Sequence, residues 1–120
     1  MIKLTHQEEE VMLVIWNRGE GFIKDYLELM EEPRPPYTTL ASVVKNLERK
    51  GYLESKRYGN TYRYRPLISE EQYKKGFLSN VVRHYFENSY KEMVTFFARE
   101  EKISPEELQE IINLIERQRK

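Results

Sequence analysis

The stretch YTTLASVVKNLERKG, residues 37–51, predicts the helix around which the rest of the chain is organised. Its apolar residues recur at i, i+3, i+4 and i+7, the spacing of one buried helical face: Leu40, Val43, Val44 and Leu47. Gly51 then acts as a stop, because glycine readily adopts the left-handed conformation that follows many helices. We therefore expect a helix from about Thr38 to Lys50.

The opposite side of this helix is polar, and its centre line carries no acid, although Glu48 lies at its edge. A helix of this length, about 20 Å, fits the DNA major groove, and ammonium, hydroxyl and amide groups can contact phosphates and base edges. The alternative is an ordinary solvated face, but such faces usually alternate charge signs. The pattern favours a DNA-reading surface made of Thr38, Thr39, Ala41, Ser42, Lys45, Asn46 and Arg49.

Residues 52–66 change to strand character on both sides of Gly59-Asn60, a two-residue hairpin signal. This turn places Lys56 opposite Arg63, and like charges directly across strands are unfavourable unless an anion lies nearby. A hairpin whose Arg57 and Arg63 rest on a DNA backbone would meet that anion. The alternative is that the long side chains splay apart. The hairpin tyrosines are expected to pack on the sheet, since tyrosine favours strands.

The residues before Pro33 predict two further helices. Thr5 and Glu8 form a capping box ahead of the apolar run 11–16, and Gly19 follows as a stop. Phe22–Met30 reads as the second helix, and Phe22 is also compatible with a short strand. Three short helices followed by a hairpin is the order of a winged helix-turn-helix, which we assign to residues 1–66 as a DNA-binding domain.

Residues 67–120 predict three more helices and a helical dimerisation domain. Capping boxes at Ser69/Gln72 and Ser104/Glu107 begin two of them, and the first is expected to run to about Ser89. Their apolar content exceeds what a short helical hairpin buries, which is typical of a subunit interface. Packing onto the N-terminal domain is the alternative. The expected interface residues are Phe77, Val81, Phe86, Met93, Phe97, Leu108, Ile111, Ile112 and Ile115. The predicted fold class is mostly α with a small β-hairpin wing.

The charge of the 120-residue chain is segregated along the sequence. Lys+Arg and Asp+Glu number 20 each, so the net charge is zero. Residues 1–33 nevertheless carry three basic and eight acidic residues, whereas residues 34–65 carry eight basic and two acidic ones. A basic segment in a neutral chain indicates a polyanion partner at one surface. The alternative is pairing between this segment and the acidic first third.

Several function classes find no support in the sequence. There is no cysteine, the two histidines lack a ligand set, and no catalytic or phosphate-binding motif is present. We therefore expect neither an enzyme nor a metal or cofactor site. The longest apolar run has six residues and no signal peptide is evident, so we expect a cytoplasmic protein without membrane insertion.

The sequence resembles the penicillinase and methicillin-resistance repressors, the BlaI/MecI/CopY type of bacterial regulator. The resemblance rests on Leu-Thr…Glu…Val-Met…Ile-Trp at 4–16, on the stretch 37–53, on Asn-Thr-Tyr-Arg-Tyr-Arg-Pro at 60–66, on Tyr-Phe-Glu-Asn-Ser at 85–89 and on Ile-Ser-Pro-Glu-Glu-Leu at 103–108. It implies a homodimeric transcriptional repressor with an N-terminal winged helix that binds a pseudo-palindromic operator. The matching recognition-helix positions are Thr39, Ser42, Lys45 and Asn46.

The resemblance also carries two departures that concern control. Copper-responsive members have cysteine pairs near the C-terminus, and this chain has no cysteine. Antibiotic-responsive members are inactivated by proteolysis at an Asn-Phe bond, and the corresponding position here is Phe96-Phe97. Asn is thus missing at this bond, and a different protease, a different cleaved bond or no cleavage are the alternatives. A membrane-bound sensor metalloprotease is a partner that the resemblance alone implies.

These patterns together predict a sequence-specific, dimeric DNA-binding repressor. Lys45 and Asn46 would read bases, while Thr39, Ser42, Arg57 and Arg63 would hold phosphates. The alternative function is a winged-helix protein-interaction module that uses the tyrosine-rich hairpin and does not bind DNA. A ligand-sensing regulator is a third option, for which the sequence provides no convergent polar pocket.

Overall fold

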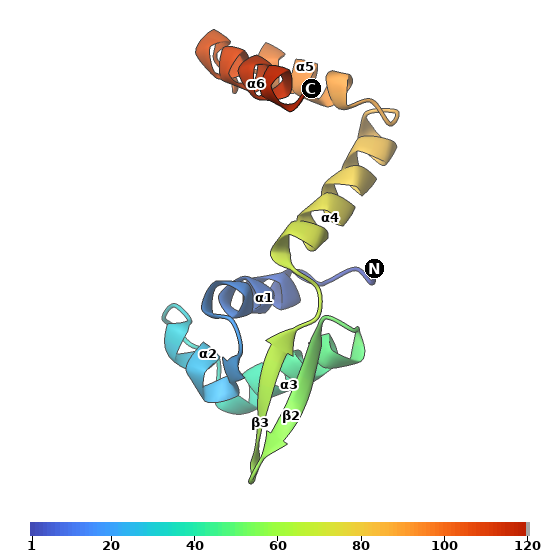
Figure 1. Cartoon of the computed structure of the whole chain (residues 1–120). Helices are drawn as coiled ribbons and strands as arrows, with labels where there is room; N and C mark the ends of the chain where they lie inside the picture. The colour runs from blue at the N-terminus through green and yellow to red at the C-terminus, as the bar shows by residue number, and fades with distance from the viewer. Residues whose placement is uncertain (120) are drawn as a thin grey trace. The chain divides into compact units, whose positions relative to one another are not determined.

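The computed structural model describes residues 1–119 and divides the chain into two compact units, Met1–Gly76 and the part from Phe77 onward. The elements, drawn in Figure 1, are α1 (His6–Arg18), β1 (Gly21–Phe22), α2 (Ile23–Leu29), α3 (Tyr37–Arg49), β2 (Leu53–Tyr58), β3 (Thr61–Pro66), α4 (Glu70–Tyr85), α5 (Tyr90–Arg99) and α6 (Pro105–Gln118). The predicted class, mostly α with a small β-hairpin wing, is confirmed. No helix among the described residues is long and apolar enough to cross a membrane.

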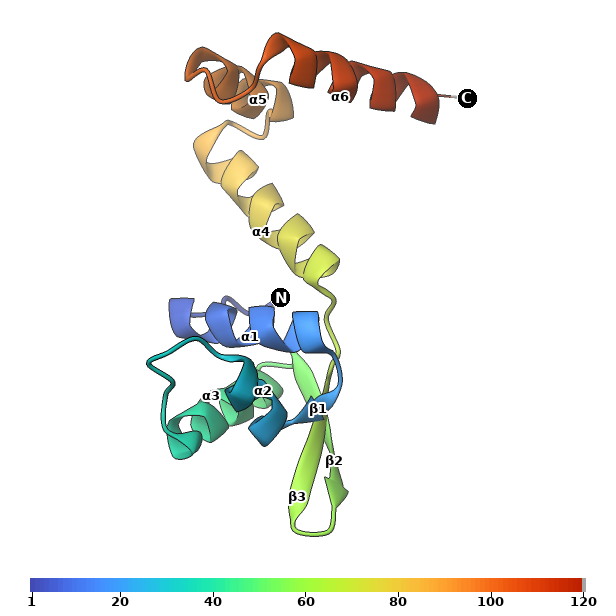
Figure 2. The ribbon, with the colours of Figure 1, turned by 90° about the vertical axis from the view of Figure 1, so that its left-hand side faces the viewer.

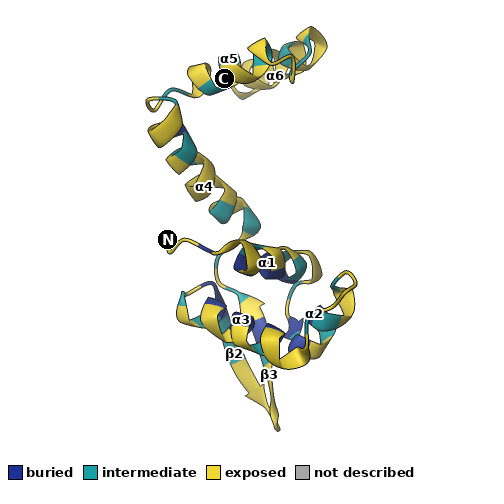
Figure 3. Cartoon of the chain, turned by 180° about the vertical axis from the view of Figure 1, so that it is seen from behind, coloured by how far each residue is buried: buried dark blue, intermediate teal, exposed yellow. Residues whose placement is uncertain are grey.

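The first unit is built around α3, as the opening stretch predicts. The four apolar residues of its inner face are all buried: Leu40, Val43, Val44 and Leu47. They pack in one cluster with buried residues of α1 and the hairpin, visible as dark blue segments of α1–α3 in Figure 3. Lys50 caps α3, and Gly51 follows with φ of 85°, a conformation that side chains other than glycine rarely adopt.

The hairpin has the predicted register, and it belongs to a three-stranded antiparallel sheet of order β1-β3-β2 (Figure 2). Lys56 pairs with Arg63, and the short β1 adds Phe22 on the other side of Arg63. The pairing of β1 with β3 was not predicted, because a strand of two residues is too short to show an alternating pattern. The hydroxyl of Tyr26 donates to Gly19 O at 2.8 Å, and burial raises the pKa of Tyr26 to about 12.

The first unit continues beyond the hairpin into α4. Trp16 Nε1 donates to Ile68 O at 2.8 Å, and the Tyr73 hydroxyl donates to the Glu9 carboxylate. The Tyr73 ring also lies 5.5 Å from that of Trp16 and 5.9 Å from that of Tyr52. These contacts explain why the first turns of α4 group with the winged helix. The assignment of functions to residues 1–66 and 67–120 stays a prediction.

The second unit contains the rest of α4 together with α5 and α6. The capping boxes at Ser69 and Ser104 form as predicted. The expectation that the first of these helices reaches Ser89 is wrong: α4 ends at Tyr85, because Glu87 and Asn88 take positive φ values of 50° and 61°. Ser89 instead caps α5 by accepting from Glu92 N.

Candidate nucleic-acid interface

The outer face of α3 is exposed along its whole length. Ala41 is half-buried, and the other six predicted contact residues are solvent-exposed: Thr38, Thr39, Ser42, Lys45, Asn46 and Arg49. The fold thus brings the predicted recognition-helix residues together on one surface, and the chain's own first unit leaves that surface open (Figure 3).

The first turn of α3 differs from that of every other helix in residues 1–119. Each of the other five carries an acid there, such as Glu8 in α1 or Glu70 in α4, whereas α3 carries none. Pro36, its N-cap, supplies no side-chain hydrogen bond. The positive end of the helix dipole is therefore neither neutralised nor capped by a side chain, which favours a nearby anion.

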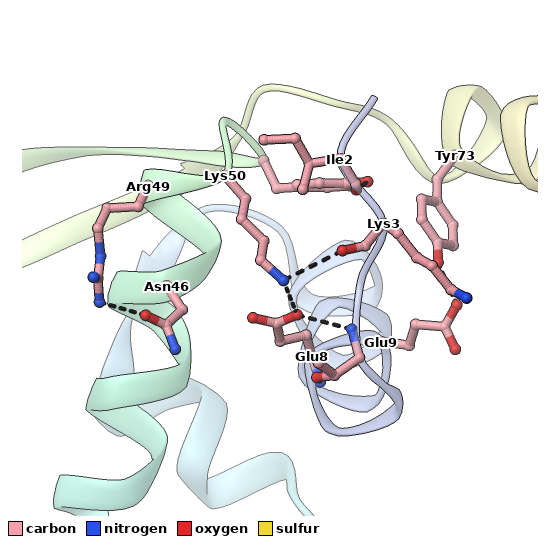
Figure 4. Close-up of polar contacts among 10 residues, drawn as sticks. Ile2, Lys3, Glu8, Glu9, Asn46, Arg49, Lys50 and Tyr73 are labelled. Atoms are coloured by element: carbon pink, nitrogen blue, oxygen red, sulfur yellow. Dashed lines mark hydrogen bonds and ion pairs between the residues drawn. The ribbon is translucent and has the colours of Figure 1, made fainter.

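Two polar side chains of the outer face contact each other. The Arg49 guanidinium donates to Asn46 Oδ1 (Figure 4). The amide oxygen has a second lone pair and the amide NH₂ group remains available to donate. Both amide groups of Asn46 can therefore still bond adenine, while Arg49 holds the side chain in place.

The end of α3 is fixed by Lys50, whose role the sequence analysis missed. Its ammonium group lies 2.6 Å from Glu8 Oε1 and 3.3 Å from Lys3 O (Figure 4). Burial penalises the charged form of Glu8, which is 5% exposed, but Lys50 and the Thr5 amide outweigh that penalty and lower the pKa of Glu8. Lys50 thus ties α3 to the start of α1 and does not belong to the exposed basic surface.

Two of the three hairpin arginines, Arg63 and Arg65, form ion pairs within the chain, whereas Arg57 bonds only a backbone oxygen. Arg57 is exposed and donates to Gly59 O at 2.9 Å, near the tip. Arg63 is half-buried, with its Nε 3.5 Å from Glu20 Oε1. Lys56, opposite Arg63, lies 5.8 Å from the centre of the Tyr58 ring. Glu20 thus supplies an anion beside this like-charged pair from within the chain, and a further contact of the pair with DNA stays a prediction.

The hairpin tyrosines divide into two pairs. Tyr52 and Tyr64 are buried in the core, as expected for sheet packing. Tyr58 and Tyr62 are 43% and 46% exposed; Tyr58 makes an edge contact with Phe22, and sheet packing stays a prediction for Tyr62. The difference arises because strand residues near a hairpin tip extend past the helices that cover the sheet (Figure 2).

An open groove of about 490 Å³ lies beside the outer face of α3. Its walls are mainly apolar residues of α1, α2 and the proline-rich loop, among them Leu13, Leu29 and Pro35. Thr39 is the member of the predicted DNA surface that lines it. The groove and the basic surface are thus largely separate.

The second unit exposes the residues expected at a subunit interface. Phe77, Phe97, Ile111, Ile112 and Ile115 are between 41% and 49% exposed, and Val81, Phe86, Met93 and Leu108 are half-buried. Leu114 and Phe96, which were not among the expected interface residues, are similarly exposed. Neither α5 nor α6 buries a residue. This unit therefore presents apolar surface of the kind that usually packs against another surface.

The helices and hairpin of the first unit define it as a winged-helix domain of the kind that transcriptional regulators carry. The chain belongs to the penicillinase repressor family, whose model matches residues 4–117. The predicted family membership is thus confirmed, and the family is one of transcriptional repressors.

Relatives along nearly the whole chain carry matching names. The chain is 23% identical over 115 residues to the methicillin resistance regulatory protein MecI of Staphylococcus aureus, covering 94% of this chain and 93% of that protein. It is 24% identical over 115 residues to the penicillinase repressor of Bacillus licheniformis, covering 95% and 90%.

A solved structure shares the fold. It is that of an organohalide-sensing transcriptional regulator in its ligand-free form, with a TM-score of 0.50 and 14% identity. The match covers 98% of this chain and 63% of that regulator's chain.

Proposed function

We propose that this repressor acts as a homodimer that binds a pseudo-palindromic, double-stranded DNA operator and thereby blocks transcription. Two copies of α3 would enter successive major grooves, with centres about 34–36 Å apart. The observation that carries the proposal is the outer face of α3, which is exposed, contains no acid on its centre line and begins with an uncapped, acid-free first turn.

The side chains of this face suit distinct tasks. Lys45 and Asn46 lie on the exposed middle of α3 and would read base edges, Lys45 by donating to guanine and Asn46 by bonding adenine. Thr38, Thr39, Ala41 and Ser42 are small enough to let the helix approach closely, and the hydroxyl groups of the two threonines and the serine would contact phosphates. Arg49, at the last turn, would contact the backbone through donors that its bond to Asn46 leaves available.

The hairpin would supply further phosphate contacts. Arg57 is exposed beside the tip and is the stronger candidate. Arg63 would have to exchange Glu20 for a phosphate, so its net contribution should be smaller. The homodimer is supported by the apolar side chains that α5 and α6 leave exposed, since burying them between two copies would remove them from water.

Selection of bound duplexes from a random pool tests the operator. We expect enriched sequences with two-fold symmetry and half-sites one helical turn apart or a multiple of it. A pool that gives no enrichment, or enriched sites without symmetry, contradicts the proposal.

Two variants separate base reading from backbone binding. Asn46→Ala should cost about 1–3 kcal/mol per half-site of the selected operator and relax its preference at one base pair in each half-site. Arg57→Ala should weaken binding to all sequences alike and reduce the salt slope by about one for each protomer of the dimer. Lys24→Ala, which removes one exposed charge from α2, is the matched control and should leave both properties unchanged.

A second candidate function is a protein-interaction module that never touches DNA. The exposure of Tyr58 and Tyr62 on the hairpin supports it, because tyrosine is enriched at protein interfaces. The two functions differ in their dependence on salt. A DNA-binding protein should be retained on a DNA column and elute as salt rises, whereas an interaction module should elute early at any salt concentration.

Release from DNA by proteolysis is a separate part of the proposal. Phe96 and Phe97, which by the resemblance correspond to the family's cleaved bond, lie inside α5 and their rings contact each other. A protease, such as a membrane-bound sensor metalloprotease, would have to unwind α5 to reach that bond. Mass spectrometry of the protein from antibiotic-treated cells tests this route: a fragment ending at Phe96 supports it, and an intact chain under inducing conditions contradicts it.

A further inference from the structure

The acid closest in sequence to the DNA-facing residues of α3 is held by the sheet. Ser55 Oγ, on β2, donates to Glu48 Oε2 at 2.6 Å in a partly buried hydrogen bond. Ser55 pairs with Tyr64 on β3. Burial of Tyr64 is the main cause of its raised pKa, and the negative charge of Glu48 is the second cause. The Glu48 carboxylate therefore lies against the sheet rather than on the outer face of α3.

This arrangement leaves the neighbouring lysine free. Lys45 lies three residues before Glu48 and is exposed, and within residues 1–119 no ion pair shorter than 4.0 Å engages it. Residues three apart on a helix are neighbours, and opposite charges at this spacing attract each other. A Glu48 side chain released from Ser55 could therefore pair with Lys45 and would place a negative charge beside the DNA-facing surface.

We propose that Ser55 is a positioning residue for DNA binding: its hydroxyl holds Glu48 on the sheet and keeps Lys45 available for DNA. This inference rests on the proposed function, because it assigns Lys45 to the duplex. Ser55 itself would touch no DNA and would act through Glu48.

The test measures the affinity of four dimeric variants and of the unchanged protein for the operator at a low and a high salt concentration. Ser55→Ala should weaken binding about threefold to tenfold, with a smaller loss at high salt, where charges are screened. Ser55→Thr keeps a hydroxyl on a residue that strands favour and should bind as the unchanged protein does. Adding Glu48→Gln to Ser55→Ala should restore binding, and Glu48→Gln alone should leave it within about twofold.

Restoration by Glu48→Gln is the decisive result, because a merely structural loss at Ser55 would persist in the double variant. Urea unfolding followed by the fluorescence of Trp16 reports any loss of fold separately. If the unchanged protein binds no selected duplex, the proposed function fails and this inference fails with it. If it binds but Ser55→Ala binds equally well, or the double variant stays weak, only the role of Ser55 is overturned.

Discussion

The two units of the chain differ in where they keep their apolar side chains. Thirteen of the fourteen buried hydrophobic residues in the described chain lie in the first unit, and Val82 is the one in the second. The first unit encloses its core with three helices and a sheet, whereas α5 and α6 bury no residue. The first unit thus has the features of an independent fold, while the second presents a surface that another chain can complete.

The same contrast holds for charge. In the first unit most acids have partners within the unit, as Glu8 has Lys50 and Glu48 has Ser55, while the outer face of α3 keeps its cations exposed. Polar partners thus hold Glu8 and Glu48 away from the face that would meet DNA, whereas Glu10 and Glu31 line the groove that Thr39 also lines.

The core of the first unit should be sensitive to lost volume. Leu47→Ala should lower the free energy of unfolding by about 2–5 kcal/mol, because Leu47 is fully buried on the inner face of α3. Urea unfolding followed by Trp16, the single tryptophan, measures this unit. Leu29→Ala is the matched control, since Leu29 is 51% exposed and its loss should cost under about 1 kcal/mol. Equal effects would contradict the assignment of the core.

The apolar surface of the second unit should respond to an added charge through association rather than folding. Ile112→Lys should raise the dissociation constant of the dimer at least about 100-fold, near 2.7 kcal/mol, because an unpaired charge would be buried. Sedimentation measures this change, and the Trp16 unfolding curve of the resulting monomer should stay in place. Gln109→Lys, at an exposed polar position of α6, is the control. A variant that remains dimeric would show that this face is not the interface.

The Glu8–Lys50 pair should stabilise the first unit in a pH-dependent way. At about pH 7, Lys50→Gln should cost about 1–3 kcal/mol, since it leaves the buried Glu8 carboxylate without its cation. The folded-state pKa of Glu8 lies below its ordinary value of 4.5, so this stabilisation is present above that value and is lost as pH falls through the folded-state pKa. Unfolding measured at several pH values should show the two proteins converging in acid. A difference that stays constant would assign the cost to packing.

The exposed ion pair of the hairpin should contribute least. Arg65 and Glu54 contact each other across the strands, but their side chains are 53% and 46% exposed, so solvent screens them. Glu54→Gln should change the free energy of unfolding by under about 0.5 kcal/mol in the same assay. A loss above about 1 kcal/mol would show that the hairpin is held by its charges rather than by Leu53 and Tyr64.

Local sequence signals predicted most elements of the fold. Capping boxes placed the starts of α1, α4 and α6, and the i, i+3, i+4, i+7 pattern identified the inner face of α3. The Gly59-Asn60 turn fixed the hairpin register. These signals depend on residues within about seven positions of one another, which is why they can be read from the chain alone. The pairing of β1 with β3 and the end of α4 depended on contacts and backbone angles that no such pattern encodes.

The sequence predicted which residues belong to the candidate site, but not which side chains bond one another there. The helical wheel identified which side chains lie on the outer face of α3, because helix geometry fixes their directions. It could not show that Arg49 bonds Asn46, that Glu20 pairs with Arg63, or that Lys50 turns toward Glu8. In the Glu20–Arg63 and Glu8–Lys50 pairs, the two partners lie more than forty residues apart along the chain. The net charge of residues 34–65 counts every Lys and Arg equally and cannot distinguish an exposed cation from one that is bonded within the chain.

The amino-acid sequence by itself determined the helices and the hairpin, the four inward residues of α3 and the family to which the chain belongs. Tertiary structure alone decided which cations stay free and which are paired, since an ion pair depends on distances of a few ångströms between segments far apart in the chain. It also decided that α5 and α6 leave their apolar faces in solvent. The physical reason is that periodicity fixes the direction of a side chain within its own helix, whereas only the packing of different segments fixes what that side chain meets.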